Sequence, residues 1–134
     1  MLRKSPTSRK SSLGVCLANL AGVCTERGEL DQALAAAREG LPLLQDVGNA
    51  WSVLDHLALR AALAGKLANA ARLAGYVDLA VVARESPRQP NEARAHQRLQ
   101  ALLREKLSND EFEQLLAEGA KMTEDEACRL ALED

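Results

Sequence analysis

Apolar residues recur every three or four positions along most of the chain, the spacing that places side chains on one face of an α-helix. The pattern predicts helices over 13–26, 30–46, 50–64, 67–84, 91–106, 109–119 and 124–133. Residues 1–12 are Ser-rich, basic and aperiodic, so we expect a flexible tail there. Residues 13–84 should form two helix pairs, and residues 85–134 a loop followed by three capping helices.

Turn signals separate these predicted helices. Gly28 and Gly65 each follow an apolar run, and glycine favours the left-handed conformation that ends a helix. Pro42 lies inside the second predicted helix and should kink or restart it, because proline removes a backbone hydrogen bond. Two prolines exclude helix over residues 85–90.

Two capping boxes predict where the last two helices begin. In each, a Ser or Thr precedes a Glu by three residues: Ser108 with Glu111, and Thr123 with Glu126. Gly119 should close the helix that lies between them.

Gly28 and Gly65 also anchor an internal repeat of 37 residues. Around the first glycine stand Leu17, Leu20, Ala21, Cys24, Ala33 and Ala37. At the same offsets around the second stand Leu54, Leu57, Ala58, Ala61, Ala70 and Ala74. Small residues at fixed places let two antiparallel helices approach closely, so each copy should form one helix pair.

This pattern resembles the tetratricopeptide repeat (TPR), a helix pair of about 34 residues with a large residue, a Leu-Gly/Ala pair and a second-helix alanine at fixed positions. Here Leu17 and Leu54 occupy the large positions, and Ala33 and Ala70 the second-helix position. The copies lack the usual aromatic residue and the final proline, so they are divergent. The resemblance implies a right-handed superhelical stack of antiparallel helix pairs.

The composition agrees with an all-α fold. Leu and Ala fill 48 of the 134 positions, Ile is absent, and aromatic residues make up about 2%. Leu and Ala favour helices, whereas the β-branched and aromatic residues typical of strands are scarce. A chain that is 47% hydrophobic and 27% charged is not disordered, so we expect a folded protein with a core of small side chains.

The charge pattern argues against direct nucleic-acid binding. The net charge is −2, with a basic segment at residues 1–12 and an acidic one at residues 110–134. Residues 84–106 carry several arginines, but glutamates are interspersed and no aromatic residue is present to stack on bases.

We expect a cytoplasmic protein. No apolar run approaches the ~20 residues that span a bilayer. The uncharged segment 13–24 is interrupted by Asn19 and lacks a clean signal-peptide cleavage site, so it fits a repeat helix better. Cys16 and Cys24 would lie ~12 Å apart on one helix, too far for a disulfide, and Cys128 is alone, which suits a reducing compartment.

A wider resemblance covers residues 46–134. Its motifs are Asp46-Val-Gly-Asn, Trp51, Leu57-Ala58, Gly65 and Ala70-Ala-Arg-Leu-Ala-Gly75, then Leu107, Phe112, Gly119, Glu126-Ala127 and Leu132. They resemble the C-terminal region of large multidomain bacterial transcriptional regulators, which are LuxR-like or winged-helix proteins with an ATP-binding module, and of their cyclase-associated relatives. The phosphate-binding Gly-x-x-x-x-Gly-Lys-Ser/Thr motif and a complete helix-turn-helix are absent from the sequence given. The resemblance therefore implies a signalling protein whose part here binds protein.

No residue constellation demands a reaction, so we expect no catalytic residue, cofactor or metal site. His56 and His96 lie on separate predicted helices without further metal ligands at suitable spacing. Asp55 could orient His56 as a base, yet no motif places a nucleophile. An enzyme or small-ligand site near Asp55 and His56 remains an alternative, as does a structural cap without a ligand of its own.

The leading hypothesis is a non-enzymatic protein–protein interaction module whose groove is lined by the first helix of each repeat. Helical phase assigns these groove residues: Asn19, Val23, Arg27, Val53, His56 and Arg60. Trp51 is either a core residue or the anchor of a partner.

We also expect a homodimer. The predicted helix 13–26 is apolar nearly all round, and such a helix should be buried on all sides. A twofold axis would pack it against its own copy through Leu13, Leu17, Leu20 and Cys24. Alternatively, the stripe binds an upstream part of a larger protein.

Overall fold

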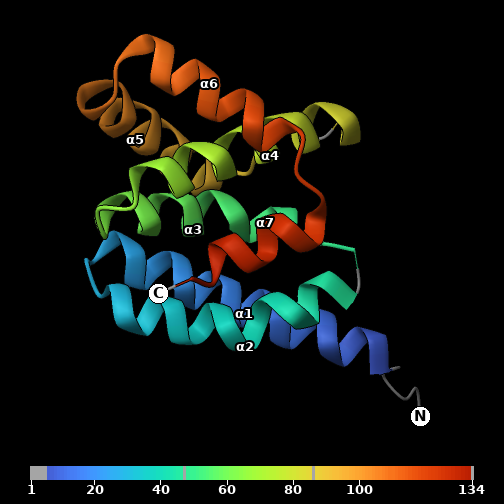
Figure 1. The fold of residues 1–134 in the computed structure, drawn as a ribbon. Coiled ribbons are helices and arrows are strands. Elements are labelled where there is room, and N and C mark those ends of the chain that lie inside the picture. The colour runs from blue at the N-terminus through green and yellow to red at the C-terminus, as the bar shows by residue number, and fades with distance from the viewer. Residues whose placement is uncertain (1–5, 47, 86, 134) are drawn as a thin grey trace.

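The computed structural model describes residues 6–46, 48–85 and 87–133, and the regular structure in these residues is entirely α-helical (Figure 1). The helices are α1 (Pro6–Glu26), α2 (Leu30–Asp46), α3 (Trp51–Leu63), α4 (Leu67–Arg84), α5 (Pro90–Lys106), α6 (Asn109–Ala120) and α7 (Glu124–Ala131). The all-α fold is confirmed, and all predicted helices except the first agree with the structure to within two residues at each end.

The first helix begins earlier than the periodicity predicts. Helix α1 begins at Pro6 rather than at residue 13, so a flexible tail over residues 1–12 is wrong for residues 6–12, and residues 1–5 lie outside the described residues. Proline suits the first turn of a helix, and extending an existing helix adds one backbone hydrogen bond per residue. An apolar stripe is therefore not needed for α1 to continue towards the N-terminus.

Pro42 does not restart α2, which is assigned as one helix through to Asp46. The flanking side chains of Leu41 and Leu44 are buried in the core. Their burial stabilises the helical conformation on both sides of the proline, which offsets the single backbone hydrogen bond that proline removes.

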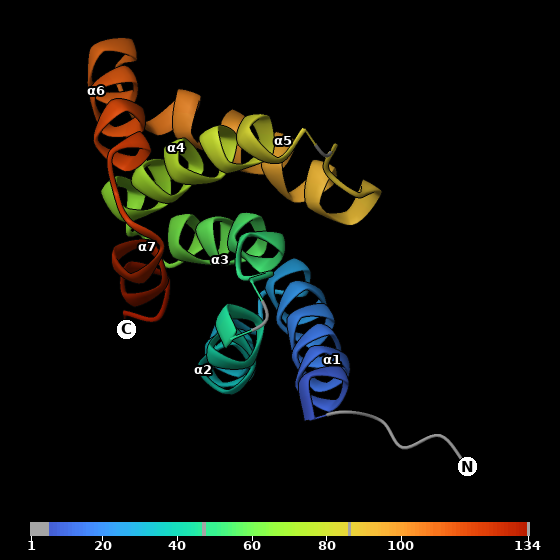
Figure 2. The same cartoon turned by 90° about the vertical axis from the view of Figure 1, so that its right-hand side faces the viewer.

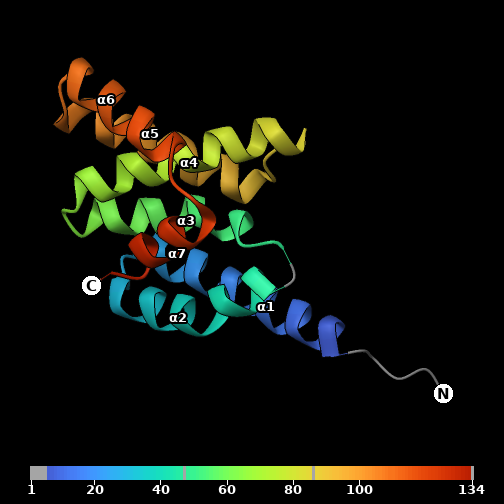
Figure 3. The same cartoon turned by 45° about the vertical axis from the view of Figure 1, so that its right-hand side comes forward.

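The first four helices form two antiparallel pairs, α1–α2 and α3–α4 (Figures 1 and 3). Gly28 and Gly65 end the first helix of each pair with left-handed φ angles of 78° and 88°, as predicted. The turns also share their hydrogen bonds: Glu29 N donates to Cys24 O and Lys66 N donates to Ala61 O, both at 2.8 Å. The 37-residue repeat of the sequence is therefore a repeat of local structure.

Small residues are buried at the same place in each pair. The equivalent residues Ala21 and Ala58 are buried, and so are the second-helix residues Ala33 and Ala70, as expected for close helix packing. One repeat position differs: Leu20 of α1 is 50% exposed, whereas its equivalent Leu57 of α3 is fully buried. The α1–α2 pair packs against α3, but no described element packs beyond α1.

The later helices cover the second pair. Helix α5 packs on α3, α6 packs on α4, and α7 lies against α3 and α4 (Figure 2). The largest fully buried side chains are mostly leucines: Leu41, Leu44, Leu54, Leu57, Leu59, Leu73, Leu99 and Leu103. The core is thus built from the Leu and Ala residues that dominate the composition.

Helices α4 and α6 cross in backbone contact. A Cβ atom built on Gly75 would lie 2.1 Å from Leu116 O, and one built on Gly119 would lie 1.8 Å from Arg72 O. Gly119 therefore does not close its helix, since α6 continues to Ala120. Its missing side chain allows the close approach instead, as with glycine at other tight backbone contacts.

Side chains of the first two pairs hold the C-terminal helix and the residues after it. Gln45 of α2 donates to the Asp125 carboxylate of α7. Asn69 of α4 donates to Glu133 Oε2 at 3.1 Å. Helix α7 thus joins the α1–α2 pair to the α3–α4 pair, and its first turn lies near the end of α2 (Figures 1 and 3).

Both predicted capping boxes are present. Ser108 Oγ accepts from Glu111 N and Thr123 Oγ1 accepts from Glu126 N, each at 3.2 Å. We expect Ser108→Ala and Thr123→Ala each to lower the free energy of unfolding by ~1 kcal/mol, because each leaves a helix-start amide without its acceptor. Urea titration would measure this, and Ser108→Asp, which keeps an acceptor, should stay close to the original stability.

Candidate functional site

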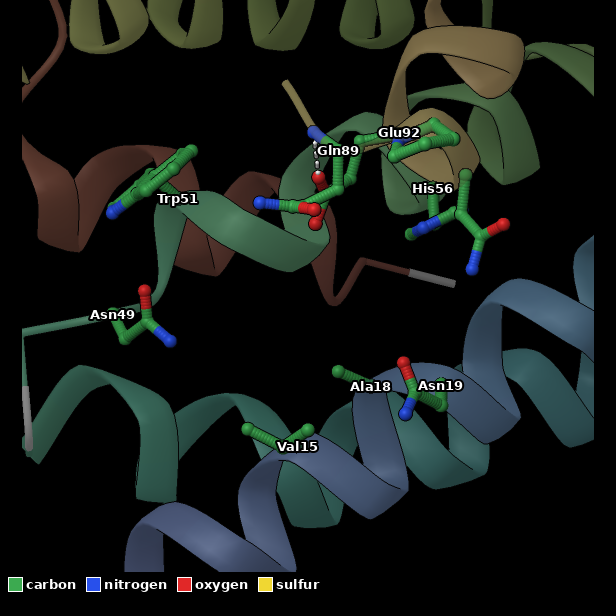
Figure 4. Close-up of a pocket in the computed structure, with 10 residues that line it drawn as sticks. Val15, Ala18, Asn19, Asn49, Trp51, His56, Gln89 and Glu92 are labelled. Atoms are coloured by element: carbon green, nitrogen blue, oxygen red, sulfur yellow. Dashed lines mark hydrogen bonds between the residues drawn. The ribbon is translucent and has the colours of Figure 1, made fainter. Parts of the chain in front are cut away.

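A cavity of about 590 Å³ lies between α1, α3 and the beginning of α5 (Figure 4). We call it the central cleft. Its lining residues are Val15, Ala18, Asn19, Asn49, Trp51, His56, Gln89, Pro90, Asn91 and Glu92. A smaller cavity of about 180 Å³ shares Asn19, His56 and Asn91 with it and extends along α1. The volume of the central cleft lies within the ~300–1,000 Å³ usual for ligand sites.

Side-chain amides dominate the polar lining of the central cleft. They are Asn19 of α1, Asn49 of the turn before α3, Gln89 of the segment between α4 and α5, and Asn91 in the first turn of α5. In Figure 4, Asn19 and Asn49 lie towards α1 and α2, and Gln89 lies across the cleft from them. Part of this hydrogen-bonding capacity is used within the protein, because Asn91 Oδ1 accepts from Arg94 Nη2 at 2.8 Å and the Gln89 side chain caps the first turn of α5.

Trp51 supplies the aromatic surface of the cleft. The indole is half-buried, and the Arg84 guanidinium lies 5.4 Å from the ring centroid in a cation–π contact. Arg84 is not among the residues that line the cleft, whereas the indole itself is. Trp51 is therefore partly packed, as a core residue would be, and partly available in the cleft, as the anchor of a partner would be.

His56 forms the wall between the two cavities. It is 8% exposed, and its ring packs against Gly22, where an added Cβ would lie 3.1 Å from ring atoms. Its Nδ1 atom is buried and has no hydrogen-bond partner among the described residues. Burial lowers the pKa of His56 from its usual 6.5, and the nearby carboxylates of Glu92, Asp55 and Glu26 only partly offset this.

The lowered pKa of His56 predicts an acid-sensitive fold. As the pH falls below 6.5, His56 takes up a proton more readily in the unfolded chain, so the free energy of unfolding should fall until the pH reaches the folded pKa. The slope from one proton is at most about 1.4 kcal/mol per pH unit. Carboxylates contribute in acid as well, so the measurement is the difference between the original chain and His56→Gln. Parallel stability curves below pH 6.5 would contradict the prediction.

A partly buried ionic cluster lies beside the cleft. Arg88, in the segment between α4 and α5, donates from Nε to Asp55 Oδ2 at 2.8 Å and from Nη2 to Asp78 Oδ1 at 2.7 Å. In α5, His96 Nδ1 lies 3.7 Å from Asp55 Oδ1, and His96 Nε2 lies 3.6 Å from Asp78 Oδ1. The cluster ties α3, α4 and α5 together, and we call it the Arg88 cluster.

The Arg88 cluster positions one wall of the cleft. Helix α4 ends at Arg84, Glu85 follows in a left-handed conformation, and residues 87–89 are irregular as predicted. The exclusion of helix over 85–90 is wrong for Pro90, the first residue of α5, because proline suits the first turn of a helix. Gln89 N donates to Glu92 Oε2 at 2.7 Å, which closes the first turn of α5. Because Arg88 directly precedes the lining residues 89–92, its ion pairs determine where this wall lies.

The structure brings together three of the seven residues predicted to bind a partner: Asn19, Trp51 and His56 line the central cleft. Val23 lines the smaller cavity, and Arg27 is exposed and pairs with Glu29 at 3.1 Å.

Val53 and Arg60 do not line a groove. Both are buried, and Arg60 Nε donates to Leu30 O at 3.0 Å. Helix α3 has neighbours on several sides, so helical phase alone did not show which of its faces remains open.

Sequence reasoning missed much of the cleft, namely Val15, Ala18, Asn49 and residues 89–92. The turn residue Asn49 and the segment 89–92 lie at or beyond helix ends. Helical periodicity does not predict which way side chains point in such segments. The available signals were the amides clustered around Pro90 and next to Trp51 in the sequence.

The residues predicted for self-association divide into two groups. Leu13 and Leu20 are about half exposed. Leu17 is partly buried against Gly40 of α2, and Cys24 is buried in the core, so neither belongs to an open surface. The exposed apolar stripe of α1 is instead Leu13, Cys16, Leu20 and Val23.

Asp55 does not act as the orienting partner of His56. Its Oδ2 atom binds Arg88, while His56 Nδ1 is unpartnered. The three cysteines are free thiols, and burial raises the pKa of the Cys128 thiol to about 12. In residues 6–46, 48–85 and 87–133, no three His, Cys, Asp or Glu side chains are grouped to hold a metal ion. Within the same residues, no helix has the length and apolar character needed to cross a bilayer.

Comparisons of the chain with protein-family models, with curated proteins and with solved structures found no significant match.

Proposed function

We propose that this chain is a non-enzymatic helical module that binds a segment of another protein in the central cleft. The observation that carries this proposal is the combination of Trp51, four side-chain amides and a volume of about 590 Å³ in one cavity. Trp residues are enriched at the energetic centres of protein interfaces, and amides match the hydrogen-bonding groups of a peptide main chain.

The paired architecture supports a TPR-like origin for the module. Two antiparallel pairs with equivalent glycine turns and buried alanines are what divergent TPR copies should give. On this proposal the pairs stack as in a TPR superhelix, and the module belongs to the C-terminal region of a cytoplasmic bacterial transcriptional regulator, as the motifs of residues 46–134 suggest. The partner is then a segment of a signalling protein or of the rest of the regulator.

The geometry supports protein binding over an enzyme near Asp55 and His56. Asp55 is turned towards Arg88, and no Ser or Cys that could act as a nucleophile is among the described side chains that line the central cleft. The remaining alternative, a structural cap without a ligand of its own, is separated from the proposal by the following experiment.

Selection from a random 12-residue peptide library displayed on phage tests the proposal. The immobilised full chain should enrich peptides whose binding is lost in Trp51→Ala and kept in Val82→Ala, which changes an exposed apolar residue of α4 that does not line the cleft. Circular dichroism would confirm that both variants keep their helix content. If no enriched peptide depends on Trp51, the structural cap becomes the better description.

We also expect the chain to form a homodimer through the α1 stripe. Leu20 is half exposed where Leu57 is covered by the preceding pair, so a second copy of α1 can supply the missing cover. Sedimentation at micromolar concentration should give a dimer for the original chain and a monomer for Leu13→Glu with Leu20→Glu. The matched control is Leu79→Glu with Val82→Glu, which changes two exposed apolar residues of α4 and should leave the dimer intact. If the original chain sediments as a monomer, the predicted homodimer is wrong.

A further inference from the structure

We propose that the central cleft binds its protein segment through one cationic side chain, a lysine or an arginine, that is held by Trp51 and Glu92. This inference rests on the proposed function and specifies which kind of side chain anchors the bound segment. It follows from the charge of the lining residues, the electrostatic field at the inner wall of the cleft, and the aromatic and apolar surface beside them.

The lining of the central cleft carries a net negative charge. Its carboxylate is that of Glu92, and none of the described residues that line it is a Lys or Arg. Glu92 Oε2 accepts the Gln89 N–H at 2.7 Å, but this hydrogen bond uses one of about four lone-pair sites of a carboxylate and leaves the charge in place. The N-terminal end of α5 contributes about half a positive charge, which is less than the full negative charge of the carboxylate.

The ring of His56 reports the sign of the field at the inner wall, since it lines both cavities. Burial lowers the pKa of His56 below its usual 6.5, so the ring is neutral at pH 7 and does not cancel the charge of Glu92. Of the charges that act on this ring, Glu92 is the strongest, followed by Asp55 and Glu26, and all three favour a positive charge. Arg94 opposes them and acts more weakly than any of the three. The inner wall therefore attracts a cation.

Trp51 provides a surface on which a cation can stack. The indole already holds the Arg84 guanidinium 5.4 Å from its ring centroid, and Arg84 does not line the cleft whereas the indole does. A cation over the face of an indole is attracted by the negative charge density of the ring. Val15 and Ala18 line the same cavity, and Lys and Arg side chains bury their methylene groups against such apolar surface. A long cationic side chain thus matches both the charge and the apolar surface of the cleft.

The Trp51-dependent peptides from the phage selection test this inference when they are synthesised singly and titrated against the full chain. Trp51 is the only tryptophan in the sequence, so its fluorescence reports binding when the peptides contain none. We expect each peptide to contain a Lys or Arg whose replacement by a neutral analogue, norleucine or citrulline, weakens binding about tenfold. Added salt should also weaken the binding of the cationic peptides.

Glu92→Gln separates the charge of this residue from its role in the fold. A capping box takes Glu or Gln at this position, so the first turn of α5 should be kept. We expect the variant to bind the cationic peptides about fivefold more weakly. It should bind the norleucine or citrulline analogues as the original chain does, because both changes remove the same interaction. Glu111→Gln is the matched control, since it makes the same change in the capping box of α6, outside the cleft lining, and should leave the affinity unchanged.

Each outcome decides between the anchor and the proposed function. If the Trp51-dependent peptides need no Lys or Arg, or bind Glu92→Gln as tightly as the original chain, the cationic anchor is refuted while the proposed function stands. If the neutral analogues lose affinity in Glu92→Gln to the same extent as the cationic peptides, the carboxylate does not contact the cation and the anchor is again refuted. If no peptide depends on Trp51, the proposed function fails and the inference falls with it.

Discussion

Arg88→Ala should lower the free energy of unfolding by about 3 kcal/mol. The substitution removes both ion pairs of the Arg88 cluster and leaves Asp55, whose side chain is 3% exposed, as a buried carboxylate without its cation. Breaking a buried pair by removing one partner costs about 3–5 kcal/mol, and we take the lower end because the Arg88 side chain is itself 15% exposed. Urea titration followed by circular dichroism would measure the change.

A second substitution identifies the cause of that loss. If the unpaired carboxylate is responsible, adding Asp55→Asn to Arg88→Ala should recover part of the stability, because a neutral amide is less costly to bury than a charge. Arg27→Ala is the matched control, since the Arg27 side chain is 69% exposed and pairs with Glu29 at 3.1 Å outside the lining of the central cleft. It should change stability by no more than about 0.5 kcal/mol. If the double variant loses as much stability as the two single variants together, the unpaired carboxylate does not explain the loss.

The Arg88 cluster also links stability to the cleft. Arg88 directly precedes Gln89 and Pro90, so its loss should release that wall while the leucine core remains packed. Trp51 should then become more accessible to acrylamide in Arg88→Ala than in Arg27→Ala, at a urea concentration where both variants are folded. Equal quenching would show that the wall keeps its position without the ion pairs.

Helix positions could be predicted because their signals are local. Gly28 and Gly65 end helices through their own φ angles, and Ser108 and Thr123 accept hydrogen bonds from amides only three residues away. The restart considered at Pro42 and the helix end expected at Gly119 do not occur, for a common reason. Each carries a strong local tendency to end a helix, and in each case tertiary packing decides the outcome instead.

The cleft was only partly predictable. Helical phase assigned Asn19 and His56 to a groove, and both line the central cleft. It placed Val53 on the same side, although neighbouring helices bury that residue. The wall formed by residues 89–92 depends on contacts between Arg88 and two distant carboxylates, at Asp55 and Asp78. Such pairings have no periodic signature in the sequence.

Gly119→Ala should lower the free energy of unfolding by about 3 kcal/mol, although the same substitution in an open helix usually stabilises it by roughly 0.5–1 kcal/mol. The reversed sign follows from the crossing of α4 and α6, where the new methyl group would lie 1.8 Å from Arg72 O. A backbone oxygen cannot rotate away as a side chain can, so one helix must move and the packing around it is lost. Ala117→Gly on the exposed side of α6 measures the helix propensity alone and should cost about 1 kcal/mol.

Gly75→Ala should be destabilising as well, because its methyl group would lie 2.1 Å from Leu116 O on the facing helix. Gly75 of α4 and Gly119 of α6 each face the backbone of the other helix where the two helices cross. A single displacement of α6 therefore relieves both clashes. The double variant should therefore lose less stability than the sum of the two single variants, as expected for residues that share one backbone shift. Thermal and urea unfolding of the four chains would measure the coupling. Strict additivity, or a stabilising Gly119→Ala, would show that α4 and α6 are not in backbone contact in solution.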